Sequence, residues 1–373
     1  MFAKEGLEGV IAARTAISLI RGEDGSLGYR GYAIGDLARN SNFEETTYLL
    51  WYGELPKTDE LAAFVATLRK SRDLSPGVAD LIARWPRSAE PIDLLRTAVS
   101  TMASDDPDVA DNSEAANRRK GTRIAAAMPT IVAAYRRLAA GLAAVAPDPA
   151  LSHAANFLFM LRGRRPETIE AEALDLALVL QADHGLNAST FAARVAAGTL
   201  ADLHAAVTAA VATLKGPLHG GAASEVILTM QAVASPSNAD AYVARQLADR
   251  RKIAGFGHRI YQHSDPRTPP LREMLWRLAK HNNLERWSAL AGAISDAVRK
   301  HRRIEPNVDF YTASVYDLLE IDGSTFSSVF ACARIAGWVA HVIEQHSDNR
   351  LIRPGEEYLG PLARRYVPIT QRQ

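Results

Sequence analysis

The chain has 373 residues, more than a single hydrophobic core usually serves, so its length favours two domains or one large domain with a lobe. Apolar residues make up 47% and charged residues 23% of the sequence, which is ordinary for a soluble globular protein. The net charge of +1 excludes a bulk field that attracts nucleic acid or membranes, so any anion binding must come from local clusters.

Three features bear on where the protein works. Cys332 is the only cysteine and lies in the apolar run FSSVFACARIAGW, so no disulfide within the chain is possible and a core position is expected. The first residues, MFAKEGLEGV, carry no basic region followed by an apolar stretch, and no run of about 18 apolar residues is found. We therefore expect no signal peptide, no membrane span and a reducing cytoplasm.

Helix dominates the expected secondary structure, and the fold class is mainly α. The one good hairpin candidate is TAISLIRGEDGSLGYRGY, where Asp24-Gly25 separates two short runs suited to strands. The polar, aperiodic stretch at residues 103–121 indicates a surface loop.

One helix is expected over the segment that leads to His184. Apolar residues at helical spacing run from Ile169 to Leu180, and His184 continues this row. A histidine on an apolar face is usually a satisfied core residue, so His184 alone is weak evidence for a site.

Two more helices can be placed by their ends. One is predicted to start at Thr199, with Asp202 in its first turn, and to stop before Gly216-Pro217. Another is predicted to start near Thr325. Arg334 leans toward its buried side and, if buried, needs an anionic partner.

His219 lies in LKGPLHGGAASEV, between a predicted helix stop and a predicted helix start. The flanking glycines let a ligand approach the backbone and let the loop hinge, although an ordinary helix–helix turn with an exposed histidine explains the same pattern. A phosphate-binding loop is not favoured, because the Lys-Ser/Thr pair of that motif is missing.

The segment GFGHRIYQHSDPR crowds two histidines and two arginines beside glycines. Backbone N–H groups next to glycine are open to a ligand, and arginines such as Arg259 and Arg267 can hold carboxylates in a bidentate fashion. A basic surface loop would explain the arginines but not the glycines on both sides of Phe256.

Asp309, in RIEPNVDFYTASVYDLL, is expected at a helix N-terminus, where the helix dipole favours the carboxylate form. A simple capping acid is the plainer explanation. Together, two loop histidines, a carboxylate and several arginines indicate proton transfer next to a small polycarboxylate. A metal site is the competing interpretation, but the histidines have no short ligand spacing and no cysteine pair supports them.

The sequence as a whole resembles the citrate synthase family, in the short bacterial type that includes 2-methylcitrate synthases. GPLHGGAASEV, GFGHRIYQHSDPR and EPNVDFYTASVYDLL look like the three signature blocks of the family, in the expected order and spacing. The likeness extends through GLEGVIAARTAISLI, GYAIGDLARNSNFEETTYLLWYGELP, ADHGLNASTFAARV and ARIAGWVAHVIEQHSDNRLIRP. Residues 103–121 are its weakest part.

The resemblance implies condensation of acetyl-CoA with oxaloacetate, followed by hydrolysis of citryl-CoA, with no metal and no cofactor. Asp309 matches the base that deprotonates the acyl methyl group, His219 the donor to the thioester oxygen, and His258 the group that protonates the oxaloacetate carbonyl. The implied oxaloacetate ligands are His184, His258, Arg267, Arg334 and, from the neighbouring subunit, Arg353. Plausible CoA ligands are Lys252, Gly255, Phe256, Gly257 and Arg259.

The implied fold is almost wholly helical and has two domains. Residues 1–219 and 316–373 would form a large, dimer-forming domain, and residues 220–315 a small mobile domain that carries the base and the CoA site. The partners are then acetyl-CoA, oxaloacetate and a second copy of the chain, in a dimer or an assembly of dimers.

Two departures from the family pattern bear on CoA. Gln262 stands where the family usually has a basic residue, and Gly355 begins a Gly-Glu-Glu run where relatives often carry another arginine. Neither touches Asp309, His219 or His258.

The motifs leave other functions open. A 2-methylcitrate synthase that uses propionyl-CoA needs room for only one more methyl group. A non-catalytic relative could sense CoA or a dicarboxylate, although it would not need the base. A metal-dependent hydrolase is a more distant alternative.

Overall fold

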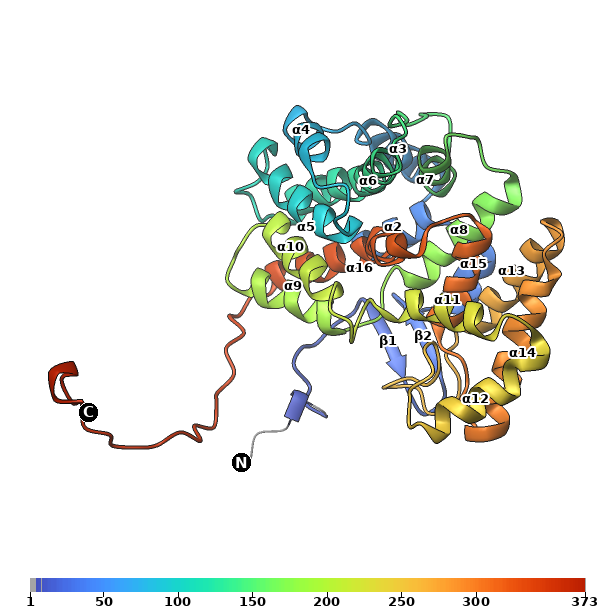
Figure 1. The fold of residues 1–373 in the computed structure, drawn as a ribbon. Coiled ribbons are helices and arrows are strands. Elements are labelled where there is room, and N and C mark those ends of the chain that lie inside the picture. Colours follow the sequence, from blue (N-terminus) through green and yellow to red (C-terminus); the bar gives the residue numbers. More distant parts are fainter. Residues whose placement is uncertain (1–4, 8, 373) are drawn as a thin grey trace.

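The computed structural model describes residues 5–7 and 9–372, and within them the chain is mainly helical, as predicted (Figure 1). Its one sheet is antiparallel and consists of β1 (Ser18–Arg21), β2 (Ser26–Tyr29) and β3 (Tyr32–Ala33). Ser18 pairs with Tyr29, and Gly25 has a φ of +66° in the turn, so the hairpin prediction is confirmed. The third, two-residue strand was not predicted.

A layered body of helices fills the upper part of Figure 1. Its outer layer contains α3 (Thr58–Lys70), α4 (Pro76–Arg84), α6 (Glu114–Ala139) and α7 (His153–Arg162). The layer beneath contains α2 (Phe43–Tyr52), α5 (Pro91–Met102), α8 (Thr168–Gln181), α9 (Ala188–Gly198) and α10 (Leu203–Leu214). The helix α1 (Ile34–Asn40) contacts α8, β2 and β3. Short 3-10 turns are formed by Glu5–Leu7, Ala103–Asp105, Pro236–Asn238, Gly323–Thr325 and Ile369–Gln371.

The helix α16 (Phe326–Ser347) runs through the centre of this body and packs on α6, α9, α10 and α2. Among the described residues, one segment departs from the expected lack of a membrane span, because Gly323–Ser347 is long and apolar enough to cross one. In the structure 89% of its apolar window is buried inside the protein, so its apolar surface is used by the core. Cys332 is buried in this helix, as expected.

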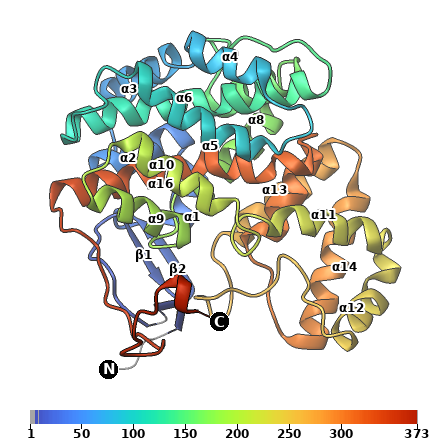
Figure 2. The same cartoon turned by 60° about the vertical axis from the view of Figure 1, so that its left-hand side comes forward.

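A second group of helices lies together beside the sheet (Figure 2). It consists of α11 (Ala222–Val233), α12 (Ala239–Ala248), α13 (Thr268–His281), α14 (Glu285–Arg302) and α15 (Val308–Leu318). These helices pack on one another, α12 on α14 and both α11 and α13 on α15. The group covers the residues expected for a small domain, and the boundaries at 219/220 and 315/316 stay a prediction.

The expected surface loop at residues 103–121 is wrong for its second half, which forms the first two turns of α6. Lys120 is fully buried there, and its Nζ donates to the carbonyl oxygen of Asp111 at 2.6 Å. The guanidinium of Arg123 binds both carboxylate oxygens of Asp106, at 2.6 and 2.9 Å. Polar side chains point inward here because each one has a partner, which a polarity pattern does not reveal.

Two helix ends differ from the predictions, and two agree. α8 ends at Gln181, so His184 lies in the loop after it and not on its face. Thr199 ends α9, whereas α10 starts at Leu203 with Asp202 as its N-cap, accepting from the amide of Ala205 at 3.0 Å. The stop before Gly216-Pro217 and the start after Thr325 are confirmed.

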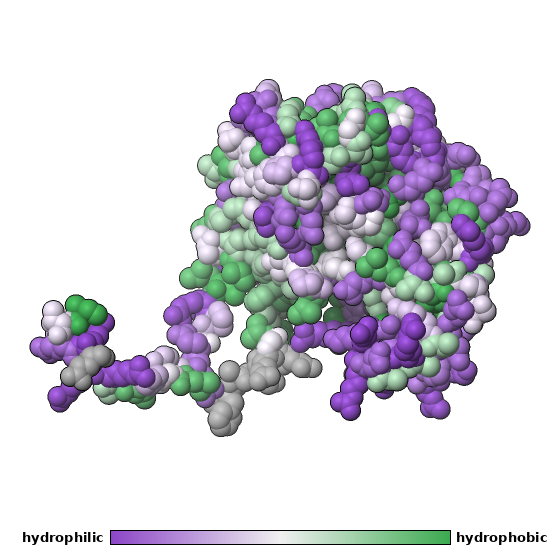
Figure 3. Space-filling model, in the orientation of Figure 1, coloured by the Kyte–Doolittle hydropathy of each residue, from purple (hydrophilic) through white to green (hydrophobic). Residues whose placement is uncertain are grey.

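The C-terminal residues 351–372 run away from the body as an extended tail (Figure 1). Apolar side chains are uncovered along it (Figure 3), and Leu359 is 88% exposed. Other exposed apolar residues of the tail are Leu351, Tyr358, Leu362, Tyr366 and Ile369. Exposure of this size on a monomer is unusual and marks surfaces that other molecules cover.

Candidate active site

The predicted site residues come together where three loops meet the side of α16 and the start of α15. His184 lies between α8 and α9, His219 between α10 and α11, and His258 between α12 and α13. Arg334 comes from the interior of α16 and Asp309 from the first turn of α15. Residues far apart in the sequence face one another because segments that follow α8 and α10 pack against α16, where Arg334 donates to the carbonyl of Gln181 and Ser327 to that of Gly220.

His184 is buried and contacts both the ring of His258 and Tyr261. Its Nε2 lies 3.0 Å from the Tyr261 hydroxyl, and the two imidazole centroids are 5.2 Å apart. Burial, together with the nearby guanidinium groups of Arg267 and Arg334, holds the pKa of His184 well below its usual range. The imidazole is therefore neutral at pH 7 and acts as a hydrogen-bonding group.

His258 has one defined tautomer. Its Nδ1 accepts the backbone N–H groups of Ile260 at 3.0 Å and Tyr261 at 3.2 Å. The proton of the neutral ring must then sit on Nε2, which is left to donate to a ligand. Burial and the charge of Arg267 lower the pKa of His258 to about 4, so the ring is a neutral donor near pH 7.

The side chain of His219 rests on Ser189. Its Nε2 lies 2.9 Å from Ser189 Oγ, which also accepts the indole N–H of Trp338 at 3.1 Å. The hydroxyl proton of Ser189 can go to Asn187 Oδ1, at 2.8 Å, or to His219 Nε2. When it goes to His219, the imidazole carries its proton on Nδ1. Burial and Arg334 lower the pKa of His219 to about 4.

Asp309 follows the N-cap residue Asn307, whose Oδ1 accepts the amide N–H of Asp309 at 3.0 Å. The helix N-terminus was expected to favour the carboxylate, but the pKa of Asp309 is raised from 3.8 to about 6. Burial is the main cause, and it outweighs the opposing charges of Arg267 and Arg334, while Asp265 adds to the rise. Desolvation in this crevice is therefore stronger than the dipole. The carboxylate is still ionised at pH 7, and it is a stronger base than an ordinary aspartate.

The two buried arginines differ in how they are paired. Arg267 forms a bidentate pair with Asp265, at 2.8 Å from Nε and 2.7 Å from Nη2. Arg334 donates from Nε to the carbonyl of Gln181 at 2.7 Å, and no carboxylate of residues 5–7 and 9–372 forms an ion pair with it. The anionic partner expected for this arginine is thus not in direct contact, and burial lowers the pKa of Arg334 to about 10. A bound anion would pair with it.

The glycines of GFGH are required by the fold of the loop. Gly255 and Gly257 have φ values of +80° and +77°. A Cβ on Gly255 would lie 2.8 Å from Phe310 Cβ and 2.8 Å from a methyl group of Val226. The Gly257 N–H already donates to the carbonyl of Glu305 at 3.1 Å. It is therefore not open to a ligand, contrary to what the sequence led us to expect. The loop is instead fastened to the start of α15, where Phe256 packs on Phe310.

The remaining predicted ligands lie at the surface. Lys252 and Arg259 are exposed near this loop, and Arg353 is exposed at the start of the C-terminal tail. Their roles in binding CoA or oxaloacetate stay predictions. Of the two departures from the family pattern, Gln262 donates its backbone N–H to the carbonyl of Gly22 at 3.1 Å, and Gly355 has no neighbour within 4 Å of where a Cβ would be.

A pocket of about 270 Å³ opens beside His258, and Tyr261, Gln262, Asp265 and Arg303 help to line it. A larger cavity of about 680 Å³ lies elsewhere, between α1, α13 and α14, and contains none of the predicted site residues. In the described part of the chain, no group of three or more His, Cys, Asp or Glu side chains is placed to hold a metal ion.

Sequence reasoning missed three residues that hold the histidines and arginines in place: Ser189, Tyr261 and Asp265. All three lie inside segments that were singled out, in ADHGLNASTFAARV and in GFGHRIYQHSDPR. The Asp265–Arg267 spacing of two residues was the one available signal, because it permits a local bidentate pair. The other two contacts join residues 77 and 30 positions apart, and no local pattern reveals them.

Comparisons with known proteins agree with this geometry. The family model described as citrate synthase, C-terminal domain, matches residues 6–355. The chain is 42% identical to citrate synthase 2 of Bacillus subtilis over all of both chains. It is also 42% identical to 2-methylcitrate synthase of Mycobacterium tuberculosis, over 96% of this chain and 90% of that one.

A solved structure gives the same result for the fold. Citrate synthase of Thermoplasma acidophilum, in a ternary complex with carboxymethyl coenzyme A and oxaloacetate, superposes with a TM-score of 0.92. The two chains are 33% identical, and the match covers 98% of each.

Proposed function

Since the chain belongs to the citrate synthase family, and is therefore an acyltransferase, we propose that it condenses acetyl-CoA with oxaloacetate and hydrolyses the resulting citryl-CoA. The observation that carries this assignment is the buried cluster in which His184, His258 and Tyr261 contact one another, near Arg334, whose guanidinium forms no ion pair with a carboxylate of the described residues. The pKa shifts of the site agree with it. His219 and His258 have pKa values of about 4, and Asp309 has a pKa of about 6.

These values suit an enolisation. The α-hydrogen of a thioester is a very weak acid, so Asp309 can remove it only if the developing enolate oxygen is stabilised at the same moment. A neutral His219 with its proton on Nδ1 supplies that hydrogen bond. Loss of one such donor typically lowers the rate by about 10²–10³, which is the effect we expect of His219→Ala.

The second half of the reaction uses the opposite side of the site. His258 donates from Nε2 to the ketone oxygen of oxaloacetate, which takes up the proton when the new carbon–carbon bond forms. Arg334, which lacks a carboxylate partner of its own, and His184 hold the substrate carboxylates. Arginine suits this task because its planar fork binds a carboxylate through two hydrogen bonds and stays charged.

The proposal includes a homodimer in the cytoplasm that needs no cofactor beyond the CoA thioester. The exposed apolar side chains of the tail support the dimer, because a second copy of the chain would cover them. Arg353, at the start of this tail, would then complete the oxaloacetate site of the partner.

Propionyl-CoA is the second candidate substrate, since a relative that is 42% identical is a 2-methylcitrate synthase. A hydrophobic pocket separates two substrates that differ by one methylene by only about 1–3 kcal/mol, so both thioesters are expected to react. The ratio of the kcat/KM values for acetyl-CoA and propionyl-CoA decides between a citrate synthase and a 2-methylcitrate synthase.

The test is CoA thiol release in the presence of oxaloacetate, with acetyl-CoA and with propionyl-CoA, for the wild type and Asp309→Ala. Release that disappears in the variant supports the synthase and its base. A higher kcat/KM with propionyl-CoA moves the assignment to 2-methylcitrate synthesis. If a folded wild-type dimer binds oxaloacetate but releases no thiol from either substrate, the chain is a sensor and the proposal is wrong.

A further inference from the structure

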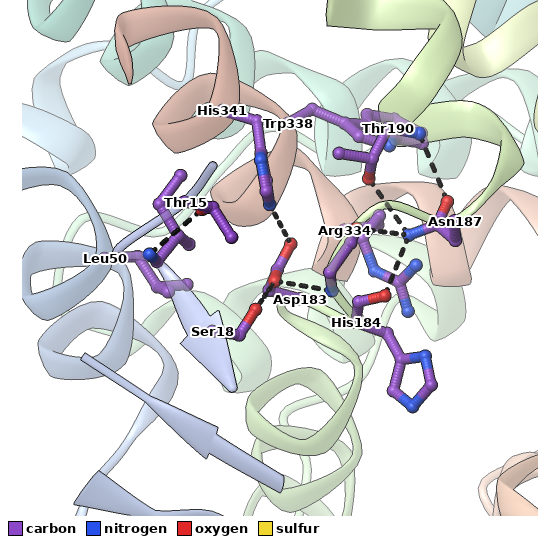
Figure 4. Close-up of polar contacts among 12 residues, drawn as sticks. Thr15, Ser18, Leu50, Asp183, His184, Asn187, Thr190, Arg334, Trp338 and His341 are labelled. Atoms are coloured by element: carbon purple, nitrogen blue, oxygen red, sulfur yellow. Dashed lines mark hydrogen bonds and ion pairs between the residues drawn. The ribbon is translucent and has the colours of Figure 1, made fainter. Parts of the chain in front are cut away.

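Four ionisable side chains form a buried row directly behind the site, and the mechanism above uses none of them. Figure 4 shows two of the four, Asp183 and His341. Asp183 and His341 are fully buried, Arg194 is nearly so, and Glu344 is half-buried at the end of the row. Burying ionisable groups is costly unless they are paired, so a row of this kind needs a reason.

The contacts of the row define the state of His341. Arg194 Nη1 lies 2.6 Å from Glu344 Oε2 and 3.1 Å from His341 Nδ1. A guanidinium can only donate, so His341 Nδ1 accepts and the ring proton sits on Nε2. That atom lies 3.3 Å from Asp183 Oδ1. Neither His341 Nε2 nor Asp183 Oδ1 has a hydrogen-bond partner among the described residues. Their contact with each other is therefore what offsets the cost of burying these two polar atoms.

The other oxygen of Asp183 shapes the loop that carries His184. Oδ2 accepts the backbone N–H of Gly185 at 2.9 Å and the hydroxyl proton of Ser18 from β1. The backbone carbonyl of Asp183 accepts from the buried Tyr29 hydroxyl at 2.8 Å. Contacts of Asp183 thus fix both residues that flank His184 in the sequence, Asp183 itself and Gly185.

The same aspartate faces the helix that carries Arg334. His341 is seven positions after Arg334, two turns along the same face of α16. Between them, Gly337 donates its N–H to the carbonyl of Ala182 at 2.9 Å. A Cβ on Gly337 would lie only 2.3 Å from Asp183 Oδ1, so the loop and the helix are in direct contact here. Asp183 and Arg334 also stabilise each other's charged forms.

We propose that Asp183 and His341 are positioning residues that set His184 and Arg334 at the spacing required by oxaloacetate, without touching the substrate themselves. This inference rests on the proposed function, because it takes His184 and Arg334 to be the oxaloacetate ligands. Both ligands contact the substrate in the ground state and in the transition state alike. Misplacing them therefore raises KM for oxaloacetate and leaves kcat at saturation almost unchanged.

The experiment compares Asp183→Asn, His341→Gln and His341→Leu with the wild-type dimer. Asp183→Asn keeps an oxygen for Gly185 and Ser18 but removes the charge, and His341→Gln keeps an N–H donor toward Asp183. We expect the Kd and KM for oxaloacetate to rise about tenfold in Asp183→Asn and His341→Leu and less than about threefold in His341→Gln. The KM for the acyl-CoA should stay within about twofold.

Glu170→Gln is the matched control. Glu170 forms a buried bidentate pair with Arg162, at 2.6 and 2.7 Å, near the other end of α8. This variant should lower the melting temperature and leave oxaloacetate binding unchanged. Oxaloacetate binding is measured by titration calorimetry without acyl-CoA, so that it does not depend on turnover.

The outcomes separate the two proposals. If the wild type does not bind oxaloacetate, the proposed function itself fails. If the wild type binds it and His341→Leu binds it equally well, at whatever melting temperature, the row is only structural and the inference is wrong. Should Asp183→Asn fail to fold, the comparison of His341→Gln with His341→Leu still decides.

Discussion

The hydroxyl of Tyr261 lies 3.0 Å from Nε2 of His184, and it joins the loop after α8 to the loop that carries His258. The same tyrosine donates its backbone N–H to His258 Nδ1, so one residue holds both imidazoles. We expect Tyr261→Phe to raise KM for oxaloacetate roughly fivefold, because a hydrogen bond of this kind contributes about 1 kcal/mol. Steady-state kinetics with oxaloacetate as the varied substrate measure this, and an unchanged KM would show that His184 keeps its place without the hydroxyl.

The acid limb of the pH–rate profile should report Asp309. The base must be ionised, and its pKa is raised to about 6, whereas His219 and His258, with pKa values of about 4, remain neutral well below that pH. We expect kcat/KM to fall about tenfold per pH unit below about pH 6. Rates between pH 5 and 8 in buffers of constant ionic strength test this. A profile that stays flat down to pH 5 would contradict it.

The buried carboxylate of Asp309 should also lower the free energy of unfolding at neutral pH. Its folded-state pKa of about 6 lies above the ordinary 3.8, so the unfolded chain releases this proton first as the pH rises. The destabilisation develops between these two values and is complete above pH 6, where it amounts to at most about 3 kcal/mol. Asp309→Asn should therefore be inactive yet melt at a higher temperature than the wild type at pH 7.5, with the difference vanishing near pH 4. Equal melting temperatures at both pH values would argue against a raised pKa.

Gly255 should tolerate no side chain. An alanine there meets the positive φ of +80° and lies 2.8 Å from Phe310, next to the base. Gly141 is the matched control, because it has a φ of +74° and open space around its Cβ position. Both Gly→Ala variants should lose about 1 kcal/mol of stability from backbone strain, but only Gly255→Ala should lose activity, by more than about tenfold. Equal activities of the two variants would mean that the position of Asp309 in α15 does not depend on the close packing of Gly255 against Phe310.

Two inactive variants should restore activity when they share a dimer. In the proposed dimer, Arg353→Ala should impair the site of the partner, whereas Asp309→Ala should impair the site of its own chain. A mixed dimer then contains one intact site, and statistical exchange of equal amounts should give about a quarter of the wild-type activity. The measurement is thiol release after the two variants are unfolded and refolded together. No recovery, with mixed dimers demonstrated by a tag, would place Arg353 in the site of its own chain or outside any site.

The sequence pointed to six site residues, His184, His219, His258, Asp309, Arg267 and Arg334, whose roles stay predictions. Its local patterns predicted the helical class, the hairpin at Asp24-Gly25, the end of α10 and the start of α16. They did so because residue type and spacing act over a few neighbours, and because whole motifs match a known family. The failed predictions came from the same source. Residues 114–121 form a helix instead of the expected loop, and their buried polar side chains have partners: Lys120 donates to the carbonyl of Asp111 and Asn117 to the carbonyl of Asn112.

What the sequence by itself determined is which groups are present and in which local conformation: glycines that permit a positive φ, an N-cap before Asp309 and loops that carry histidines. Only the tertiary structure decided their chemistry. The helix N-terminus favours an ionised Asp309, yet burial raises its pKa to about 6. Burial also makes His219 and His258 neutral donors, helped by Arg334 of α16 for His219 and by Arg267 for His258. Desolvation and charge act through space, so the strength of an acid or a base is set by neighbours that the chain brings together only when it folds.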